Sequence, residues 1–511
     1  MQNNDKKVLL RISNLKQYFP LKGGRFVKAN DGITLDIYEG ETFGLVGESG
    51  CGKSTLGRTI LQLYHQTYGR TMYYGRSLDD LAPKYVIDTV KNLKARRTKL
   101  RELEQKRDKL EADYAKLSEK EQYAKHGELD TARKLAEDAL LDITKIVGGF
   151  LVVDDLDPVI AAYSKDYAIA RKLSSMEEKR QELQVDMDDA EYAKKTAEEA
   201  GKSGKDGQLQ KAQEKLKQCD DQIAALRAQL DAGRKEIEAL RAPYANDPEF
   251  QKYEAYRDDG IDLARLEYNE MRRLRRDMQL IFQDPYSSLN PRMSVGQIIS
   301  EGMQAHNMIK KKDARMQEMV LKIMDDCGLA PYFLHRFPHQ FSGGQRQRIG
   351  IARALATKPK FVVCDEAVSA LDVSIQAQII NLLLDLKEQQ NLTYMFITHD
   401  LSVVKYISDR VGVMYLGTMV ELAAADEIFH HPIHPYTEAL LNAIPTTDTV
   451  GAKELSILEG DIPSPVNPPK GCKFHTRCKY CTEICTQVVP EWEEVRPNHF
   501  VACHHKLEAK E

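Results

Sequence analysis

The stretch GESGCGKST combines glycines, a lysine and hydroxyl side chains at a spacing suited to phosphate chemistry. It contains Gly47-x4-Gly52-Lys53-Ser54, which follows an apolar run and precedes the helical run LGRTILQL. Glycines let backbone N–H groups turn inward and bind phosphate oxygens at a helix N-terminus. Lys53 would reach the β- and γ-phosphates, and the Ser54 hydroxyl would ligate Mg²⁺. A lone match can be accidental, but the strand–loop–helix setting favours phosphate binding.

An acidic pair closes a second apolar run, FVVCDE. We expect Asp365 to hold Mg²⁺ and Glu366 to polarise an attacking water. The alternative is a solvated acidic pair at a strand end. It is less favoured, because buried strands seldom end in adjacent carboxylates unless a cation or ligand compensates.

These residues require a sheet that brings strand ends together. KFVVCDEA (Lys360–Ala367) and TYMFITHD (Thr393–Asp400) have the pattern of buried parallel strands that end in polar residues. Residues 1–80 mix short β-like runs with glycine, and the α/β texture returns from about 270. With 511 residues, the chain is long enough for two to four domains.

Residues 83–262 are highly charged and helical in periodicity. In a heptad repeat that starts at Leu209, eight of the ten a and d positions suit a helix–helix seam. The ten are Leu209, Ala212, Leu216, Cys219, Ile223, Leu226, Leu230, Gly233, Ile237 and Leu240. Upstream, Leu100, Leu103, Leu110, Tyr114 and Leu117 fit the same repeat, and Arg107 breaks it. With Gly148–Gly149 and 201–207 as hairpin tips, we expect antiparallel hairpins in a coiled-coil-like arm, rather than solvated surface helices or disorder.

Composition limits the alternatives. The net charge is −4 and the pI about 6.4, so no global basic field indicates a nucleic-acid partner. The N-terminus lacks the apolar core of a secretory signal, and no run of about 18 apolar residues predicts a membrane span. The expected compartment is the cytoplasm, where thiols stay reduced.

Four further motifs narrow the class. FSGGQRQR (Phe341–Arg348) resembles the ABC signature, normally LSGGQ, with Phe in place of Leu. SALD (Ser369–Asp372) resembles the D-loop, ITHD with His399 the H-loop, and IFQDP with Gln283 the Q-loop. Because the motifs occur in the family's order, the chain resembles an ABC transporter ATPase over about 1–80 and 268–425.

The resemblance implies two such domains head to tail, with each ATP between one P-loop and the signature of the other domain. His399 would contact the γ-phosphate, Gln283 would sense Mg²⁺, and Phe19 would stack on adenine, with Tyr18 as its rival. The expected ATP-binding residues are Phe19, Gly47, Ser49, Gly50, Cys51, Gly52, Lys53, Ser54, Thr55, Ser342, Gly343, Gly344, Gln345 and Asp372. Ala367 departs from the family's usual proline but removes no catalytic group.

Three other stretches resemble importers of the oligopeptide/dipeptide type. They are DPYSSLNPRM (Asp284–Met293), HPIHPYTEALLNAIP (His431–Pro445) and GDIPSPVNPPKGCKFHTRC (Gly460–Cys478). The resemblance implies uptake of peptides, although some relatives take nickel or other small solutes. It also implies membrane permease subunits, a second ATPase subunit, an extracytoplasmic substrate-binding protein as an indirect partner, and a location at the cytoplasmic face of the membrane.

The tail contains five of the nine cysteines. Cys472, Cys478, Cys485 and Cys503 are spaced like the cysteines of subfamily members that bind a [4Fe–4S] cluster. Four thiolates also suit Zn²⁺, and Cys481, which forms C-x2-C with Cys478, keeps zinc open. The remaining alternative is a set of reduced packing cysteines.

We therefore expect an α/β P-loop ATPase with a helical signature subdomain, interrupted by a helical arm and followed by a small Cys-rich region. The expected division is 1–82 and 263–425 for the ATPase, 83–262 for the arm and 426–511 for the C-terminal region. The alternative is a DNA-repair or chromosome ATPase of the SMC type. There the coiled coil lies between Q-loop and signature, whereas here it precedes Gln283. Soluble ABC proteins that act on ribosomes carry two P-loops, and this chain has one.

Overall fold

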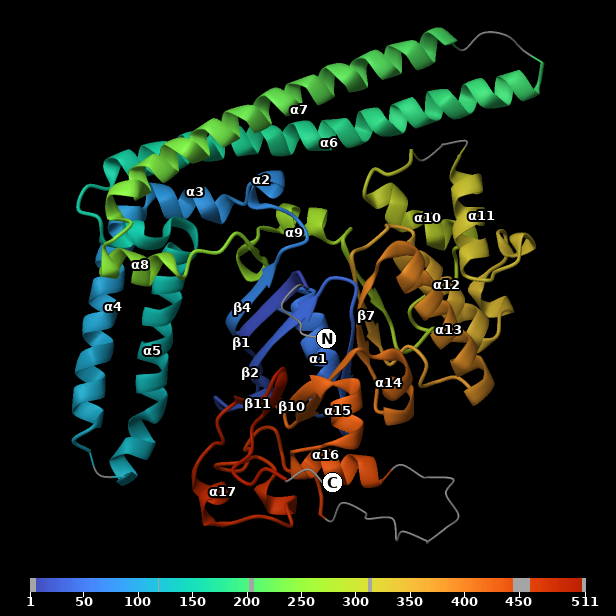
Figure 1. The fold of residues 1–511 in the computed structure, drawn as a ribbon. Helices are drawn as coiled ribbons and strands as arrows, with labels where there is room; N and C mark the ends of the chain where they lie inside the picture. Colours follow the sequence, from blue (N-terminus) through green and yellow to red (C-terminus); the bar gives the residue numbers. More distant parts are fainter. Residues whose placement is uncertain (1–5, 118, 202–205, 311–314, 444–459, 508–511) are drawn as a thin grey trace. The chain divides into compact units, whose positions relative to one another are not determined.

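The structure, a computed structural model, describes residues 6–117, 119–201, 206–310, 315–443 and 460–507. Contacts divide the chain into two units (Figure 1). Unit 1 combines Met1–Gly75 with Met271–Glu511, and unit 2 is Arg76–Glu270. Unit 2 thus extends a few residues beyond the predicted insertion, 83–262, at both ends of its residue range.

The centre of unit 1 is a mixed sheet in the order β11-β12-β10-β9-β3-β8-β7-β6. Its strands are β3 (Thr42–Val46), β6 (Met278–Ile281), β7 (Phe361–Asp365), β8 (Thr393–Ile397), β9 (Arg410–Tyr415), β10 (Thr418–Ala424), β11 (Glu493–Arg496) and β12 (His499–Val501). β3 pairs in parallel with β8 and β9, and β7 in parallel with β6 and β8. Every residue of β3, β7 and β8 is buried, which confirms the prediction of buried parallel strands for the second and third of these.

A second, antiparallel sheet in unit 1 contains β1 (Val8–Pro20), flanked by β2 (Phe26–Tyr38) and β4 (Tyr68–Tyr73). The helices of unit 1 are α1 (Lys53–Ile60), α10 (Val295–Ala305), α11 (Met316–Asp326), α12 (Gly343–Leu355), α13 (Val373–Gln390), α14 (Leu401–Ile407), α15 (Ala425–His430), α16 (Pro435–Asn442) and α17 (Glu483–Gln487).

The signature helix α12 is held in a large apolar cluster shared with α10, α11, α13 and strands β7 and β8. Phe341, at the position that is leucine in the family pattern, is buried and meets Phe333 edge to face, with 4.9 Å between the ring centroids. The apolar side chain at this position therefore anchors the start of α12 in the core.

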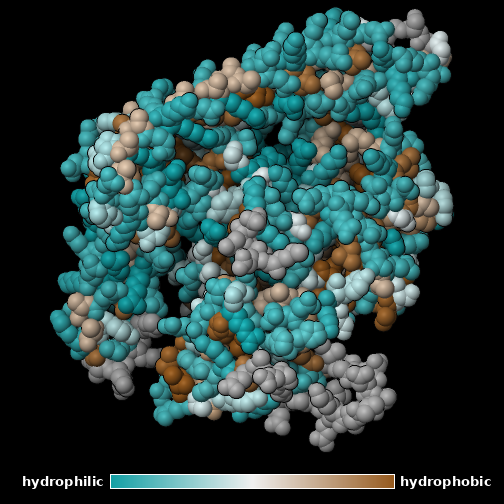
Figure 2. Space-filling view, in the orientation of Figure 1, coloured by the Kyte–Doolittle hydropathy of each residue, from teal (hydrophilic) through white to brown (hydrophobic). Residues whose placement is uncertain are grey.

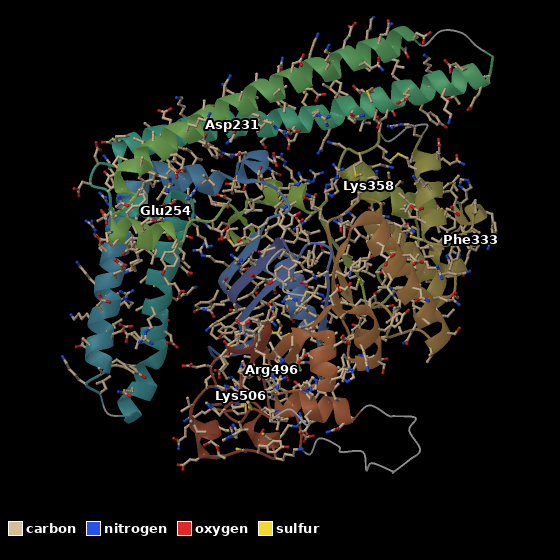
Figure 3. The ribbon with its side chains drawn as sticks, viewed as in Figure 1. Asp231, Glu254, Phe333, Lys358, Arg496 and Lys506 are labelled. Carbon is tan, nitrogen blue, oxygen red and sulfur yellow. The ribbon has the colours of Figure 1, made fainter. Side chains whose placement is uncertain are left out.

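The C-terminal region continues the main sheet through β10 and β12. Its short β-hairpin is bordered by ion pairs between Lys506 and Glu493 at 2.7 Å and between Arg496 and Glu427 at 3.6 Å (Figure 3). His499 and Glu421, both buried, form a further pair at 2.7 Å. The region is thus built onto the ATPase sheet itself. Of the stretch His431–Pro445, the last two residues lie outside the described part of the chain.

Among its described residues, unit 2 contains helices and one short strand, β5 (Ile261–Asp262). Its α-helices are α2 (Leu78–Leu81), α3 (Lys84–Lys91), α4 (Leu93–Tyr114), α5 (Glu119–Val147), α6 (Asp157–Glu199), α7 (Asp206–Arg241) and α8 (Pro248–Glu254), and α9 (Tyr268–Leu274) crosses into unit 1. Figure 1 shows α4 beside α5 and α6 beside α7. Figure 2 shows mainly hydrophilic atoms over α6 and α7 in this view.

The ten heptad positions on α7 are all buried or half-buried. The two least suited to a seam have local reasons for their place. A Cβ at Gly233 would lie 2.8 Å from Asp166 Oδ1, so glycine leaves room for that carboxylate. The Cys219 thiol is 3.6 Å from the Met176 carbonyl on α6. The repeat thus identifies the face that α7 turns toward α6.

The joint between α5 and α6 is a 3₁₀ turn, Gly148–Val152, at the predicted glycine pair. Gly148 has φ 58, and a Cβ there would lie 2.1 Å from Glu254 Oε2, so both conformation and space require glycine. Glu254 pairs with Arg241 at the end of α7 (Figure 3), whose guanidinium stacks 4.6 Å from the Phe150 ring centroid. At the other predicted tip, residues 202–205 lie outside the described part of the chain.

Unit 1 brings together the two points where the chain leaves and re-enters it. Lys360, just before β7, donates from its backbone N–H to Asp277 O at 2.8 Å and from Nζ to Gly75 O. The Tyr73 hydroxyl donates to Asp277 Oδ2 at 3.1 Å. Both ends are therefore fixed by contacts inside unit 1.

Replacing residues 76–270 by a short Gly/Ser linker should give a folded protein that still binds ATP. Long insertions between close ends cost little closure entropy, about 0.6 kcal/mol for each doubling of loop length. Thermal unfolding and ATP binding of the deletion, compared with the full chain, test this. A deletion that does not fold or loses nucleotide affinity would make unit 2 part of the catalytic core.

Candidate nucleotide site

The loop between β3 and α1 depends on glycine for close backbone packing. Gly47 and Gly52 have φ of 149 and 102. A Cβ would lie 2.2 Å from Met414 O at Gly47, and 2.1 Å from Ala29 O at Gly52. Because α1 begins at Lys53, directly after this loop, its free N–H groups face the loop. The local fold is that of an anion site.

The lysine of the loop is ordered by the loop itself. Lys53 is 4% exposed, and its Nζ donates to Gly47 O at 2.7 Å and to Glu48 O at 3.0 Å. The ammonium group is thus positioned by two backbone carbonyls of the loop, within the concave face that would hold phosphate.

Ser54 and Asp365 meet across the sheet. Ser54 Oγ donates to Asp365 Oδ1 at 2.5 Å, and Arg58 Nη2 donates to Asp365 Oδ2 at 3.1 Å. Asp365 is fully buried at the end of β7. A hydroxyl and a carboxylate are the oxygen ligands that Mg²⁺ prefers, so this pair fits the ion that accompanies ATP. Arg58 was not anticipated from the sequence.

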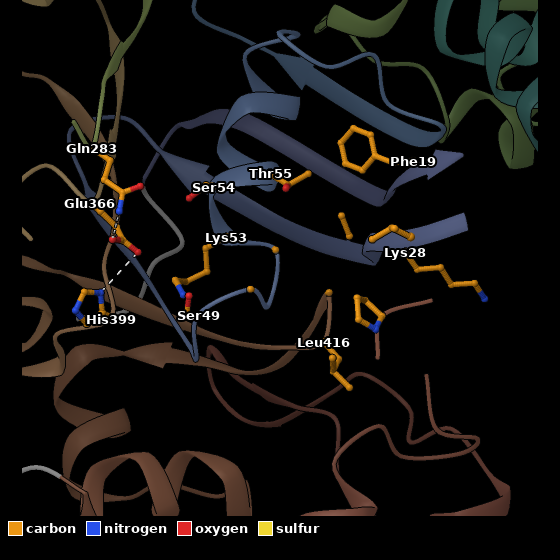
Figure 4. A pocket seen from close by; sticks show the side chains of 16 residues that line it. Phe19, Lys28, Ser49, Lys53, Ser54, Thr55, Gln283, Glu366, His399 and Leu416 are labelled. Carbon is orange, nitrogen blue, oxygen red and sulfur yellow. Dashed lines mark hydrogen bonds and ion pairs between the residues drawn. The ribbon is translucent and has the colours of Figure 1, made fainter. Parts of the chain in front are cut away.

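Glu366 lies between two other predicted residues (Figure 4). Gln283 Nε2 donates to Glu366 Oε2 at 2.7 Å, and His399 Nδ1 lies 3.6 Å from Glu366 Oε1. Glu366 has φ 49, a left-handed conformation that turns the chain sharply at the end of β7. A carboxylate flanked by an amide and an imidazole can accept a proton from a water molecule. The roles themselves stay predictions.

Of the residues described above, Gly52, Lys53, Ser54, Gln283, Glu366 and His399 line one cleft of about 550 Å³. It is bounded by Phe19, Val27, Lys28, Ala29, Ser49, Gly50, Gly52, Lys53, Ser54, Thr55, Gln283, Glu366, His399, Leu416, Gly417 and Pro465. Phe19 stands at the end away from Glu366 (Figure 4), where a base would lie if the phosphates lie at the loop. Its rival Tyr18 is engaged elsewhere, because its hydroxyl donates to Asp31 Oδ1 at 2.5 Å.

The signature residues are not among those that line this cleft. Ser342 caps α12 and accepts from Gln345 N at 3.4 Å, with Gly343 and Gly344 in the first turn. Asp372 caps α13 and accepts from Ile375 N at 3.1 Å. The resemblance assigns Ser342 and its neighbours to the ATP of a second domain, and that assignment stays a prediction.

Sequence reasoning missed one wall of the cleft. Leu416 and Gly417 form the turn from β9 to β10, and Gly417 N donates to Cys51 O at 2.9 Å. Pro465 comes from the C-terminal region, and its carbonyl accepts from Lys28 N at 3.2 Å. Pro465 belongs to a stretch singled out in the sequence, but nothing there indicated a place beside the nucleotide.

The nine cysteines are free thiols. Burial raises the pKa of the Cys503 thiol to about 12. Three neighbouring thiols add to the increase, and they are Cys472, Cys478 and Cys485. Among the residues that the structure describes, no three His, Cys, Asp or Glu side chains are arranged to hold a metal ion. The four predicted ligands thus lie near one another without the geometry of a metal site.

The fold and the cleft define a P-loop ATPase. Comparison with known families narrows the class of ATPase. The model of the ABC transporter family matches residues 30–251 and 251–369, and the chain belongs to that family. It is an ATPase that binds ATP with Mg²⁺. A second model, described as oligopeptide/dipeptide transporter, C-terminal region, matches residues 420–485. The SMC alternative is not supported.

Curated relatives agree. The chain is 52% identical over 250 residues, 48% of its length and 75% of the relative's, to the oligopeptide transport ATP-binding protein AppF of Bacillus subtilis. It is 34% identical over 498 residues to the putative oligopeptide transport ATP-binding protein YkfD of the same species, covering 97% of this chain and 95% of the relative. A putative peptide import ATP-binding protein of Brucella ovis is 54% identical over 245 residues, 48% of this chain and 77% of the relative.

Within the described residues, no helix has the length and apolar content needed to cross a bilayer.

Glu366→Gln should retain ATP binding and lower hydrolysis by about 100-fold or more, because the amide cannot accept the proton of the attacking water. Steady-state hydrolysis and nucleotide binding measure the two effects separately. Glu388→Gln, an exposed carboxylate on α13, makes the same chemical change away from the cleft and is the matched control. Near-native turnover by the Glu366 variant would reject this residue as the catalytic carboxylate.

Proposed function

We propose that this chain is the ATP-hydrolysing subunit of an importer of oligopeptides or dipeptides. The observation that carries the proposal is the joint match of the ATPase domain and of the C-terminal region at 420–485. ATP chemistry does not require that C-terminal region. Its presence beside an ATP site therefore favours the peptide-importer subfamily among ABC ATPases.

The proposed mechanism assigns each residue of the cleft one task. Phe19 stacks on the base, and Lys53 with the loop N–H groups binds the phosphates. Ser54 and Asp365 would hold Mg²⁺, which neutralises phosphate charge when bound. Glu366 accepts the proton of the attacking water, His399 orients that water, and Gln283 reports on the site to the permease.

The cleft would be completed by a second ATPase subunit. Ser342, Gly343 and Gly344 of one subunit would face the γ-phosphate held by the other, because a capped helix N-terminus with small residues binds anions. Membership of an ABC transporter family implies permease subunits in the membrane. We place the chain at the cytoplasmic face of that membrane, with a substrate-binding protein on the opposite side as an indirect partner.

The four-part division 1–82, 83–262, 263–425 and 426–511 is part of the proposal. We interpret α4–α7 as coiled-coil-like hairpins, since the heptad positions of α7 are buried or half-buried and most of its other residues are charged or polar. Mixed surface charge favours a solvated arm that binds a protein partner over one that enters lipid.

We also propose a metal site at Cys472, Cys478, Cys485 and Cys503, either a [4Fe–4S] cluster or Zn²⁺. The support is the family-like spacing of the four cysteines, together with the nearness of their thiols, each of which lies close enough to another to influence its pKa. Thiols must lose their protons to bind metal, so a site with raised pKa values releases protons on loading. The site would be structural.

ATP turnover should depend on assembly. The isolated chain should hydrolyse ATP slowly, whereas vesicles that contain the permease, a second ATPase subunit and the binding protein should hydrolyse it faster when peptide is added. The measurement is phosphate release with and without peptide, alongside uptake of labelled peptide. Fast, concentration-independent hydrolysis by a proven monomer would contradict the two-subunit site, and uptake of another solute without peptide uptake would contradict the substrate class.

Protein purified without oxygen should contain about four iron and four sulfide per chain if a [4Fe–4S] cluster forms. One zinc and no iron would assign the site to Zn²⁺ instead. Cys478→Ser should lower the metal content, and Cys219→Ser in unit 2 is the matched control. If the protein purified without oxygen contains neither iron nor zinc, the cysteines are packing residues and the proposed site is contradicted.

A further inference from the structure

One residue of the phosphate-binding loop is held from outside the ATPase motifs. Glu48 pairs with Arg477, whose Nη1 donates to Oε2 at 2.7 Å and whose Nη2 donates to Oε1 at 3.1 Å. The Glu48 backbone N–H donates to the Tyr436 hydroxyl at 2.9 Å. A two-pronged guanidinium–carboxylate pair fixes orientation as well as distance. The C-terminal region therefore holds both the backbone and the side chain of Glu48.

The pair is nearly buried. The Arg477 side chain is 4% exposed and that of Glu48 is 23% exposed. Behind them, the Phe474 ring packs against Tyr415 and Tyr436, each at 5.2 Å between centroids. Arg477 N–H donates to Phe474 O at 3.0 Å. Rigid aromatic packing thus positions the arginine, and loss of Glu48 would leave a nearly buried guanidinium without its carboxylate partner.

The same segment contacts the base end of the cleft. Lys473 Nζ lies 3.1 Å from Asp31 Oδ2 and donates to Leu416 O at 3.1 Å. Leu416 and Pro465 both line the cleft. The C-terminal region thus contacts the nucleotide site at its two ends, through Arg477 at the phosphate loop and through Pro465 and Lys473 at the other wall.

The Glu48 carbonyl is one of the two that receive Lys53 Nζ. A shift of Glu48 would therefore move the carbonyl that positions the Lys53 ammonium group, which is expected to bind phosphate. We propose that Arg477 is a positioning residue for ATP: by holding Glu48 it fixes the phosphate loop, so the C-terminal region sets nucleotide affinity. This inference rests on the nucleotide site proposed above and extends it to a residue far from the ATPase motifs.

The test measures ATP affinity of the full chain for Arg477→Ala, Glu48→Gln and the double variant. Each single variant should weaken ATP binding by about fivefold, as expected when a charged hydrogen-bonded pair is broken. The double variant should be no weaker than the weaker single one, because both changes remove the same pair. Arg477→Lys should restore part of the affinity. In the assembled transporter, KM for ATP should rise with kcat unchanged.

Lys479→Ala is the matched control. Lys479 lies on the same segment and pairs with Glu438 at 3.0 Å, away from the loop. It should leave ATP affinity unchanged. If Arg477→Ala does not fold, Glu48→Gln tests the pair from the loop side without removing the buried arginine.

The inference would be overturned if Arg477→Ala and Glu48→Gln both bound ATP as tightly as Lys479→Ala. It would also be overturned if the double variant lost as much binding free energy as the two single variants together. Lys53→Ala separates it from the site proposal. Loss of ATP binding by Lys53→Ala with unchanged Arg477 variants would reject the positioning role alone. Unchanged binding by Lys53→Ala would reject the nucleotide site itself.

Discussion

The bond between Ser54 and Asp365 joins residues 311 positions apart, and the ATP site depends on it. A carboxylate that is fully buried needs compensation, and Asp365 receives it from the Ser54 hydroxyl and the Arg58 guanidinium. Both partners lie on α1, so the start of that helix must sit at the carboxyl end of β7. β3, which leads into α1, pairs in parallel with β8, and β8 pairs in parallel with β7. This pairing sets the distance between the start of α1 and the end of β7. The other groups of the cleft are arranged around this fixed junction.

Groups whose role is local were readable from the sequence. The phosphate loop, the acidic strand end and the seam of α7 each follow from spacing within one element. The family resemblance indicated Gln283 and His399, and the structure brings both side chains to Glu366. The signature lies elsewhere in the chain's own fold, as a site shared between subunits requires.

The rest depended on contacts between distant segments. Arg58 faces Asp365 because α1 packs on the sheet, and Pro465 reaches the cleft because the C-terminal region packs beside β2. No sequence motif indicated that Arg58 or Pro465 would lie at the cleft. The contact-based unit 2, Arg76–Glu270, also includes short flanking segments beyond the charged stretch 83–262. For Cys472, Cys478, Cys485 and Cys503, the resemblance proposes metal ligands, but the directions of their side chains depend on the fold of the tail and not on their spacing.

The tie between Glu48 and Arg477 also has a consequence for how the protein is made. A ribosome completes the phosphate loop early, then adds the whole of unit 2, and only much later β7 and the segment with Arg477. During that interval the loop has its glycines and lysine but neither Asp365 nor the arginine that holds it. A nascent chain therefore cannot form the complete ATP pocket until the segment with Arg477, 429 positions beyond Glu48, has left the exit tunnel, so nucleotide capture waits for that segment.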